Sequence, residues 1–486
     1  MMTEQTRQTD VLIVGAGPTG LALGIDLARR GVDALVVEKA EALFPGSRGK
    51  GIQPRTMEVF DDLGVIDAIL AKGGRYPVGA VWQDGRKVGE HQMFEPSDKE
   101  PDTPYGEPWM VPQWRTQEIL FARLTELGGK VAFGREVTGF TQDADGVTVG
   151  FASGAPVRAR YVVAADGGRS AVRRTVGIAM TGGGGAPARA NSRVGEVDPS
   201  PMLVADVRIT GLDRDSVHVF PPRGDGGFLA IFPLAGTEDF QISAQFPEGT
   251  DIDLSLDGIR KTVAQRTHLA AEDVTELRWA SNFQPRAALA ERFRTGRVFL
   301  AGDAAHVHSP AGGQGLNTSV QDAYNLGWKL GAVLRDGAPE SLLDTYEEER
   351  LPNAADMLGL STRVHRGEIQ RGKATQQLGL GYRDRSLSVE TRTNLPEDAL
   401  QAGDRAPDRM VNGVRLFDTF RGPHWTLLAL GTEAPARVGE QVHVVAGPAV
   451  ETYGTGVFLI RPDGYVGWAG ESAEGLAEYM TRLGLV

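Results

Sequence analysis

One segment near the start of the chain constrains the fold most. An apolar run at residues 11–14 leads directly into the pattern G-x-G-x-x-G, and a helix-compatible stretch follows it to Gly31. A second apolar run at residues 34–37 then ends in Glu38. Strand, glycine loop, helix, strand and acid in this order are the dinucleotide fingerprint of a Rossmann-type α/β fold. The sequence therefore predicts a parallel sheet with a dinucleotide site at the end of its first strand.

The glycines and the acid of this fingerprint have separate physical roles. Gly15 permits a tight turn, Gly17 leaves room for a pyrophosphate, and Gly20 lets the helix pack closely on the strand. Glu38, which lies 18 residues after Gly20, is placed to accept hydrogen bonds from a pair of ribose hydroxyls. The fingerprint by itself does not separate FAD from NAD. Further candidate cofactor-binding residues of this segment are Pro18, Thr19 and Lys39.

A second segment, residues 296–330, repeats the plan of strand, loop and helix. An apolar run at residues 298–301 ends at Gly302-Asp303, and a loop rich in glycine follows. Apolar residues then recur at three- and four-residue steps, which predicts a helix that starts near Leu316. Backbone amides at such a helix start stabilise an anion, because the positive end of the helix dipole lies there.

The sequence GDAAHVHSPAGGQGLNTSVQDAYNLGWKL within this segment resembles the second flavin-binding motif of the single-component aromatic hydroxylases, the class A FAD-dependent monooxygenases. The resemblance implies that Asp303 holds the ribityl chain of FAD and that Pro310 lies beside the reactive edge of the flavin. It also favours FAD over NAD at the first fingerprint, because the second motif would hold the flavin half. The candidate flavin-binding positions in this motif are Gly302, Asp303, Pro310, Gly313, Gly315, Leu316 and Asn317.

Three shorter segments are similar to further motifs of this family. In SRGKGIQPRTMEVF the family has a flavin-contacting arginine, here Arg48, for which a solvated surface arginine is the alternative. Gln113 resembles a glutamine that the family sets against FAD before a helix, and Gln117 is a weaker candidate. AADGGRSAVRR resembles a signature shared by FAD and the nicotinamide cofactor, but its Asp166 would serve equally well as a helix N-cap. The expected catalytic residues are Arg48 and Pro310.

The middle of the chain predicts a second unit with an antiparallel sheet. Several short segments between residues 202 and 246 alternate apolar and polar side chains, which indicates hairpins. The glycine-rich segment 181–200 lacks periodicity and indicates a flexible loop or an insertion. Residues 81–114 contain five prolines and predict an irregular segment. The resemblance implies that the antiparallel sheet belongs to a substrate-binding domain.

The end of the chain predicts a small separate unit after a linker at residues 392–408. Its strand candidates include residues 425–430 and 457–460. The stretches GDRAPD, LFDTFRG and VFLIRPDGYVGWAG resemble the thioredoxin-like C-terminal domain found in part of this family. Because the chain has no cysteine, this unit cannot exchange disulfides, and we expect it to have a structural or assembly role.

The predicted architecture is therefore α/β with three domains. A Rossmann-type FAD-binding domain would comprise residues 1–180 and 285–392, with helical structure from about 341 to 379. An inserted substrate-binding domain with an antiparallel β-sheet would comprise residues 181–284. The thioredoxin-like C-terminal domain would comprise residues 403–486.

Composition excludes several other classes of protein. The net charge is −12, and no cluster of lysine and arginine interleaves with aromatic residues, so nucleic acid is not an expected partner. No run approaches the roughly 18 apolar residues of a membrane span, and the polar N-terminus is not a secretory signal. Without cysteine or H-E-x-x-H spacing, no metal site is expected. We expect a soluble cytoplasmic protein, either a monomer or a homodimer.

The function that the resemblance implies is an FAD-dependent monooxygenase. It would use NADPH or NADH and O₂ to hydroxylate a polycyclic or phenolic aromatic molecule through a flavin C4a-hydroperoxide. FAD would bind non-covalently, because the chain has no cysteine for a thioether link. The nicotinamide would bind without a Rossmann domain of its own, since no second G-x-G-x-x-G follows a strand. The alternatives are Baeyer–Villiger oxidation of a fused-ring ketone and, from another class, a catalytically silent nucleotide-binding protein.

Overall fold

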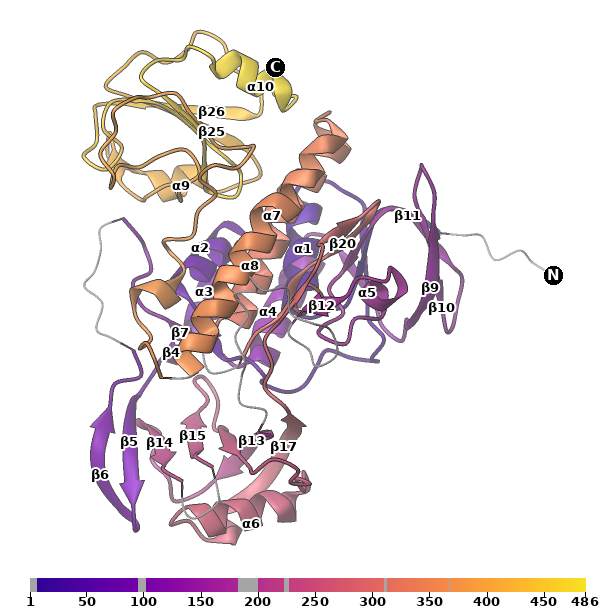
Figure 1. The fold of residues 1–486 in the computed structure, drawn as a ribbon, viewed down its shortest axis with the longest axis vertical. Coiled ribbons are helices and arrows are strands. Elements are labelled where there is room, and N and C mark those ends of the chain that lie inside the picture. Colours follow the sequence, from indigo (N-terminus) through magenta and orange to yellow (C-terminus); the bar gives the residue numbers. More distant parts are fainter. Residues whose placement is uncertain (1–6, 95–101, 182–199, 223–226, 310–312, 366) are drawn as a thin grey trace, which may run out of the picture.

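The structure is a computed structural model that describes residues 7–94, 102–181, 200–222, 227–309, 313–365 and 367–486. Figure 1 shows three parts one above another, with a central α/β unit between a C-terminal unit at the top and a β-sheet unit at the bottom. The long helices α7 (Gly315–Arg335) and α8 (Asp344–His365) lie in the central unit and reach toward the C-terminal unit. In the described ranges, no helix is long and apolar enough to cross a membrane.

The central unit is built on an eight-stranded sheet. Its strands are β1 (Arg7–Val14), β2 (Ala34–Val37), β8 (Lys130–Ala132), β9 (Val137–Gln142), β10 (Val147–Phe151), β11 (Val157–Ala164), β19 (Arg294–Thr295) and β20 (Val298–Leu300). Strands β20, β11, β1, β2 and β8 are parallel neighbours in that order. The predicted parallel sheet of a dinucleotide-binding fold is therefore confirmed.

Helices α1 (Pro18–Arg29) and α5 (Ala171–Thr175) pack against strands of this sheet, and α4 (Gln113–Glu126) and α7 pack on α1. Helix α2 (Pro54–Asp62) packs on α7, and α3 (Ile66–Lys72) packs on α4. Glycines allow α1 to lie close to its neighbours. A Cβ atom on Gly24 would lie 3.2 Å from Val36 Cγ2 on the sheet and 3.3 Å from Leu124 Cδ1 on α4. A Cβ atom on Gly327 of α7 would overlap the carboxylate of Asp26. Small residues at these crossings thus bring α7 and the sheet against opposite sides of α1.

The lower unit is a seven-stranded sheet: β5 (Val78–Gln83), β6 (Arg86–His91), β13 (Met202–Ile209), β14 (Ser216–Phe220), β15 (Leu229–Pro233), β16 (Phe240–Gln245) and β17 (Val274–Phe283). The strand order is β17-β13-β16-β15-β14-β5-β6, and only the β14–β5 pair is parallel. Helix α6 (Leu256–Arg266) covers one face, where Ile259 and Val263 join the apolar core. The predicted antiparallel sheet is confirmed.

Two predictions about segments outside residues 202–246 were wrong. Residues 81–91, which we expected to be irregular, form most of β5 and β6 and extend the lower sheet. Strand β5 pairs with β14, which is more than a hundred residues away, whereas β6 pairs with β5 in a hairpin across Asp84-Gly85, a local turn signal that was overlooked. The helical stretch expected to continue to about residue 379 ends with α8 at His365, and only the 3₁₀ turn η5 (Lys373–Gln376) follows.

Two three-stranded sheets connect the units. One consists of β3 (Gly51–Ile52), β4 (Gly74–Arg75) and β7 (Trp109–Met110), and the other of β12 (Met180–Thr181), β18 (Ala288–Ala290) and β21 (His306–Val307). In the first sheet, β3 belongs to the segment that follows β2, and β4 leads into β5 of the lower sheet. In the second sheet, β21 belongs to the segment that follows β20 and pairs with β18. Both segments therefore have defined positions between the central unit and the lower sheet.

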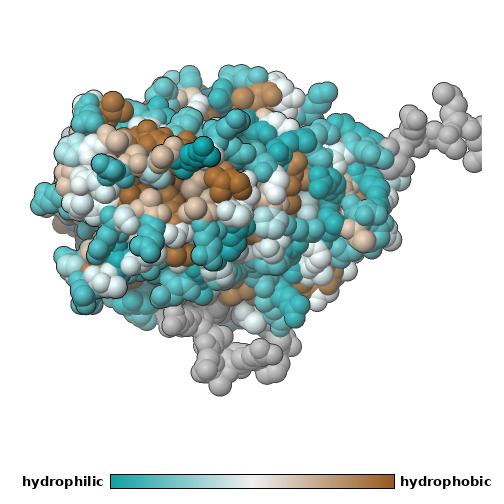
Figure 2. All heavy atoms as spheres, turned by 90° about the horizontal axis from the view of Figure 1, so that it is seen from above, coloured by the Kyte–Doolittle hydropathy of each residue, from teal (hydrophilic) through white to brown (hydrophobic). Residues whose placement is uncertain are grey.

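The C-terminal unit has a five-stranded sheet: β22 (Val389–Glu390), β25 (Trp425–Leu430), β26 (Val442–Gly447), β27 (Gly456–Ile460) and β28 (Val466–Gly470). The remaining elements are β23 (Met410–Val411), β24 (Val414–Arg415), α9 (Leu416–Phe420) and α10 (Leu476–Arg482). Strand β22 precedes Gly403, so the sheet begins before the expected boundary. Figure 2 shows this end of the molecule from above, and its surface is mainly hydrophilic with apolar side chains interspersed.

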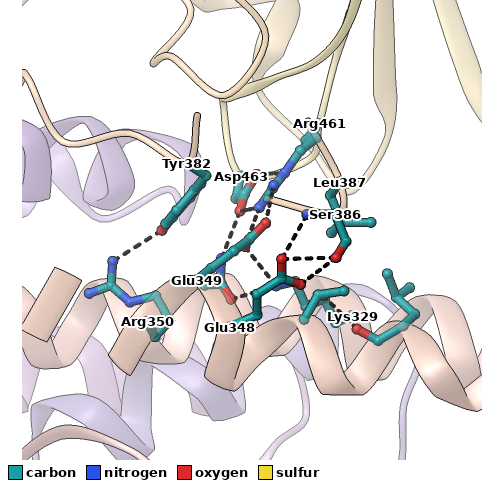
Figure 3. A network of polar contacts seen from close by, with 12 residues as sticks. Lys329, Glu348, Glu349, Arg350, Tyr382, Ser386, Leu387, Arg461 and Asp463 are labelled. Carbon is teal, nitrogen blue, oxygen red and sulfur yellow. Dashed lines mark hydrogen bonds and ion pairs between the residues drawn. The ribbon is translucent and has the colours of Figure 1, made fainter. Parts of the chain in front are cut away.

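A buried network of charges joins the C-terminal unit to helices α7 and α8 (Figure 3). Arg461 Nη1 lies 2.6 Å from Glu349 Oε1, and Lys329 Nζ lies 2.7 Å from Glu349 Oε2. Asp463 accepts from Arg461 and from Trp328 Nε1, the latter at 3.0 Å. Burial alone would raise the pKa of Glu349, but Arg461 and Lys329 lower it to about 2. The two units therefore share a buried cluster of ion pairs, in which the acids and the bases neutralise one another.

Replacing Arg461 by methionine should destabilise the protein by about 3–5 kcal/mol, because Asp463 and Glu349 would lose their main buried cationic partner. The measurement is urea-induced unfolding followed by tryptophan fluorescence and circular dichroism. Arg437→Met is the matched control, since Arg437 is an exposed arginine of the same unit. Equal unfolding midpoints for the two variants would contradict a structural role for this network.

Candidate functional site

The carboxyl ends of four parallel strands meet at one edge of the central sheet. Val14 lies opposite both Val37 and Ala164, and Ala164 lies opposite Leu300. The candidate residues that follow these strand ends are Gly15, Glu38, Asp166, Gly302 and Asp303. The register of the sheet therefore brings both glycine motifs and three acids to one place. In doubly wound α/β folds, ligands bind at this edge.

The first glycine loop has the backbone that the fingerprint requires. Gly15 has a φ of +110°, its amide donates to the carbonyl of Val37 at 2.7 Å, and a Cβ atom there would overlap the carbonyl of Ala165. Gly17 precedes α1 directly, and a Cβ atom on it would meet nothing within 4 Å. The chain thus leaves open space at the amino end of α1, where the helix dipole stabilises an anion.

The carboxylate of Glu38 is held beside this loop. Its Oε2 atom accepts from the amide of Ala16 at 2.9 Å, and its Oε1 atom accepts from the amide of Ala40 at 3.0 Å. Glu38 is half-buried, whereas the neighbouring Lys39 is exposed. Two amide donors orient the acid at the end of β2, where the fingerprint predicts a ribose partner.

The turn at Gly302-Asp303 packs directly on the first motif. Gly302 has a φ of +63°, and a Cβ atom on it would lie 2.6 Å from Thr19 Oγ1 and 3.1 Å from Ser319 Oγ. Asp303 is exposed and forms no hydrogen bond to another residue in the described ranges. Enclosure by the protein raises the pKa of its carboxyl, while His306 and Arg48 act in the opposite direction.

Helix α7 begins at Gly315, one residue before the expected start. The side chain of Asn317 fixes the loops that surround this helix start: Oδ1 accepts from the amide of Gln53 at 2.8 Å, and Nδ2 donates to the carbonyls of Gly51 and Gly313, each at 2.9 Å. The side chain of Leu316 is half-buried beside Gly49. Pro310 lies outside the described residues, so its predicted role stays a prediction.

The loop that carries Arg48 is held by the two candidate glutamines. The amide of Gly49 donates to Gln113 Oε1 at 2.9 Å, and Gln117 Nε2 donates to the carbonyl of Phe44 at 2.9 Å. The guanidinium of Arg48 lies 4.7 Å from the centre of the Phe44 ring and is exposed. Burial of the loop lowers the pKa of Arg48, Asp303 raises it, and Arg169 lowers it further. The charges of Arg48 and Asp303 therefore act on each other.

Asp166 takes part in local structure with one oxygen only. Its Oδ2 atom accepts from the amides of Ala171 at 2.8 Å and Val172 at 3.3 Å at the start of α5, where Ser170 is the N-cap. Its Oδ1 atom is buried and has no hydrogen-bond partner among the residues that the structure describes. Asp166 therefore does accept hydrogen bonds at the start of α5, and its Oδ1 atom is left for a ligand.

Sequence reasoning missed Asp322, a buried acid on α7 that positions the second motif. Its Oδ2 atom accepts from the amide of Gly302 at 3.0 Å and lies 2.5 Å from His306 Nε2, while Oδ1 lies 2.8 Å from Arg350 Nε. Burial would raise the pKa of Asp322, but His306 and Arg350 bring it below the usual value. An acid among the apolar residues of the helix was the signal that could have revealed it.

Arg286 was also missed, although it contributes to the charge around Asp303. Its guanidinium Nη2 would lie 3.7 Å from a Cβ atom on Gly168, and it acts to lower the pKa of Asp303. The residue follows β17 and therefore reaches this edge from the lower sheet. Its position could not be inferred from the first or the second motif.

These residues fit FAD as the ligand. An open amide-lined helix start suits a pyrophosphate, the oriented Glu38 suits a ribose, and the accessible Asp303 suits a polyhydroxy chain. The unpaired oxygen of Asp166 indicates one more polar ligand group. All of these groups lie along one sheet edge, as an extended dinucleotide requires.

Comparison with known families agrees with this geometry. Residues 8–361 match the model of the FAD binding domain, and residues 400–484 match the model of the C-terminal domain of aromatic-ring hydroxylases. Together, the two matches define the class of protein as an FAD-dependent aromatic-ring hydroxylase with its C-terminal domain.

Relatives match over nearly the whole length. The chain is 45% identical to a flavin-dependent monooxygenase from Mycobacteroides abscessus, over 97% of this chain and 99% of the relative. It is 34% identical to a rifampicin monooxygenase from Streptomyces venezuelae, over 98% of each. The solved ternary complex of aklavinone-11 hydroxylase with FAD and aklavinone superposes with a TM-score of 0.82 at 28% identity, covering 98% of this chain and 99% of that one. This protein therefore belongs to the flavin-dependent monooxygenase family of aromatic-ring hydroxylases, as the resemblance of its motifs predicted.

Asp303→Ala should weaken FAD binding about ten- to a hundredfold, because a hydrogen bond to a charged group contributes about 1.5–3 kcal/mol. The dissociation constant is measured by titrating apoprotein with FAD and following the quenching of flavin fluorescence. Asp67→Ala, which removes an exposed acid of α3, is the control. Unchanged affinity in the Asp303 variant would remove this acid from the cofactor site.

Proposed function

We propose that this protein is a monooxygenase that binds FAD non-covalently and uses NADPH or NADH and O₂ to hydroxylate a fused-ring or phenolic aromatic molecule. The observation that carries the proposal is the packing of the Gly302 turn on Thr19. This contact joins the dinucleotide fingerprint to the acid of the second motif. One extended ligand can therefore reach both, and FAD has the length and the polar groups for it.

Each candidate residue has a proposed task in this site. Glu38 binds the adenosine ribose, the amides at the start of α1 bind the pyrophosphate, and Asp303 binds the ribityl chain. The start of α7 faces the pyrimidine end of the flavin, where its dipole stabilises negative charge. Arg48 and Pro310 border the reactive edge. When bound, FAD supplies the redox chemistry and the activation of O₂, and the protein orients the substrate and excludes water.

The lower sheet is the proposed substrate-binding domain. We propose domain limits near those expected from the sequence, with β5 and β6 added to this domain and β22 added to the C-terminal one. The relatives support a large fused-ring substrate, since one is named for rifampicin and another was solved with aklavinone. Large ring systems of this kind present much apolar surface together with a few polar oxygens.

The nicotinamide cofactor is proposed to approach the flavin transiently, because the described part of the chain has a single parallel sheet of the dinucleotide-binding kind, and FAD would occupy it. Reduction would then depend on substrate. Oxidation of NADPH or NADH should be slow without substrate and at least about tenfold faster with a true aromatic substrate, which corresponds to roughly 1.4 kcal/mol of barrier. Stopped-flow absorbance of the flavin measures this rate, with rifampicin, phenols and polycyclic quinones as the panel.

The oxygen balance of the reaction gives a second readout. With ¹⁸O₂, the product should carry one labelled oxygen atom, and free FAD at the same concentration serves as the control. Stimulated NADPH oxidation that yields only hydrogen peroxide with every compound of the panel would contradict the monooxygenase proposal. Equally fast reduction with and without a confirmed substrate would contradict only the dependence on substrate.

A further inference from the structure

A glutamine from the segment that follows α8 lies against the start of α7. Gln377 comes directly after the 3₁₀ turn η5 and is buried. Its Nε2 atom donates to Gln314 Oε1 at 2.6 Å and to Thr318 Oγ1 at 3.3 Å. Its Oε1 atom accepts from Gln321 Nε2. The carboxamide of Gln377 therefore uses both its donor nitrogen and its acceptor oxygen on α7.

The three partners of Gln377 lie on one face of α7. Gln314 is the N-cap of the helix, and Thr318 and Gln321 follow it by four and seven residues, which is the spacing of a single helix face. The amides of residues 315–317 belong to the same first turns and are the ones that the second motif offers to the flavin. Gln377 thus contacts this helix start from outside the motif.

The N-cap residue is bonded to the same segment in the other direction as well. Gln314 is fully buried, and its Nε2 atom donates to the carbonyl of Thr375 at 3.3 Å. The carbonyl of Gln314 accepts from the amide of Thr318 at 2.9 Å, which opens the hydrogen-bond ladder of α7. A shift of Gln314 would therefore displace the first turn of the helix.

The backbone of Gln377 has an unfavourable conformation. Its φ of +63° and ψ of 13° lie in the left-handed region, which residues other than glycine rarely occupy. Such a conformation persists only where the surrounding contacts require it, whereas glycine would adopt it without steric cost. The hydrogen bonds from Gln377 to α7 are the contacts that compensate for this strain.

The segment around Gln377 is held on both sides of this residue. Before it, Gln376 Nε2 donates to the carbonyl of Gly106 at 3.1 Å. After it, the carbonyl of Leu378 accepts from Arg405 Nε at 3.3 Å. Because both neighbours are bonded to other parts of the chain, Gln377 has a fixed position from which it can hold α7.

We propose that Gln377 is a positioning residue for the cofactor. It holds the amides at the start of α7 in the orientation that stabilises the negative charge of reduced FAD. The proposal rests on the monooxygenase function and the flavin site proposed above, and it adds a residue that lies outside both glycine motifs. Amides at a helix start interact more strongly with a charged group than with a neutral one. Loss of the Gln377 contacts should therefore weaken the binding of reduced FAD more than that of oxidised FAD.

The test is the midpoint potential of bound FAD, measured by anaerobic spectroelectrochemical titration of the FAD-loaded protein without substrate or NADPH. Gln377→Met keeps the length of the side chain and removes its three hydrogen bonds to α7. Reduced FAD should lose about tenfold more affinity than oxidised FAD, which lowers the two-electron potential by about 30 mV. Gln370→Met changes an exposed glutamine of the same segment and should leave the potential unchanged.

Gln377→Gly separates positioning from stability. Glycine adopts the left-handed conformation without strain and leaves room for water at the polar groups of α7, so this variant should melt at a higher temperature than Gln377→Met. Its midpoint potential should fall as in Gln377→Met, because both variants lack the carboxamide. If neither variant retains FAD, the melting temperature of the apoprotein decides: a wild-type value supports the positioning of the site, and a lowered value assigns Gln377 to stability alone.

Two results with FAD-loaded variants would overturn the proposal. One is an unchanged midpoint potential in both variants, and the other is a potential that falls in Gln377→Met but returns to the wild-type value in Gln377→Gly. The measurement needs no turnover, so it is separate from the test of the monooxygenase. Unchanged potentials together with hydroxylation of a panel compound would overturn the role of Gln377 alone. Lowered potentials without hydroxylation of any panel compound would contradict the proposed function and leave the role of Gln377.

Discussion

The structure depends on the compensation of charges buried along helices α7 and α8. Asp322 on α7 binds the amide of the Gly302 turn and pairs with Arg350 of α8, so it fixes the second motif against the first. Farther along the same helices, Lys329 and Glu349 pair with Arg461 of the C-terminal unit. An unpartnered charge in these places would cost several kcal/mol. The site and the C-terminal unit are thus held by one pair of helices.

The loop from Phe44 to Ile52 links the cofactor edge to the lower sheet. On one side, Gly49 and Phe44 bond to glutamines of α4. On the other side, Gly46 lies against the Trp279 ring of β17, and Lys50 bonds to β16. Because this single loop touches both units, it would link the proposed substrate site at the lower sheet to the proposed flavin site by a short covalent path. The substrate-dependent reduction proposed above would need such a link.

Much of the fold could be predicted because its signals are local. The apolar runs of β1 and β2, the glycine loop and the two strand-ending acids are each read within a few residues, and the parallel register then places their ends together. The strands β5 and β22 could not be placed, since their partners β14 and β28 lie far away in the chain. The role of Asp322 also depends on distant partners: the acid stands out among the apolar residues of its helix, but only the fold brings it to the amide of Gly302 and to Arg350.

By itself, the sequence determined the class of fold, the cofactor and the order of the units. The conformational freedom of glycine and the periodicity of helices and strands are properties of a few neighbouring residues. The lack of cysteine is a property of composition. All of these can be read directly from the sequence. Only the tertiary structure decided which charges are buried together and how the C-terminal unit is attached. Arg55 donates to the carbonyl of Asp463 across 408 residues of sequence, and Arg461 meets Glu349 across 112. Such pairs form because packing removes them from water at the same place, which no local pattern encodes.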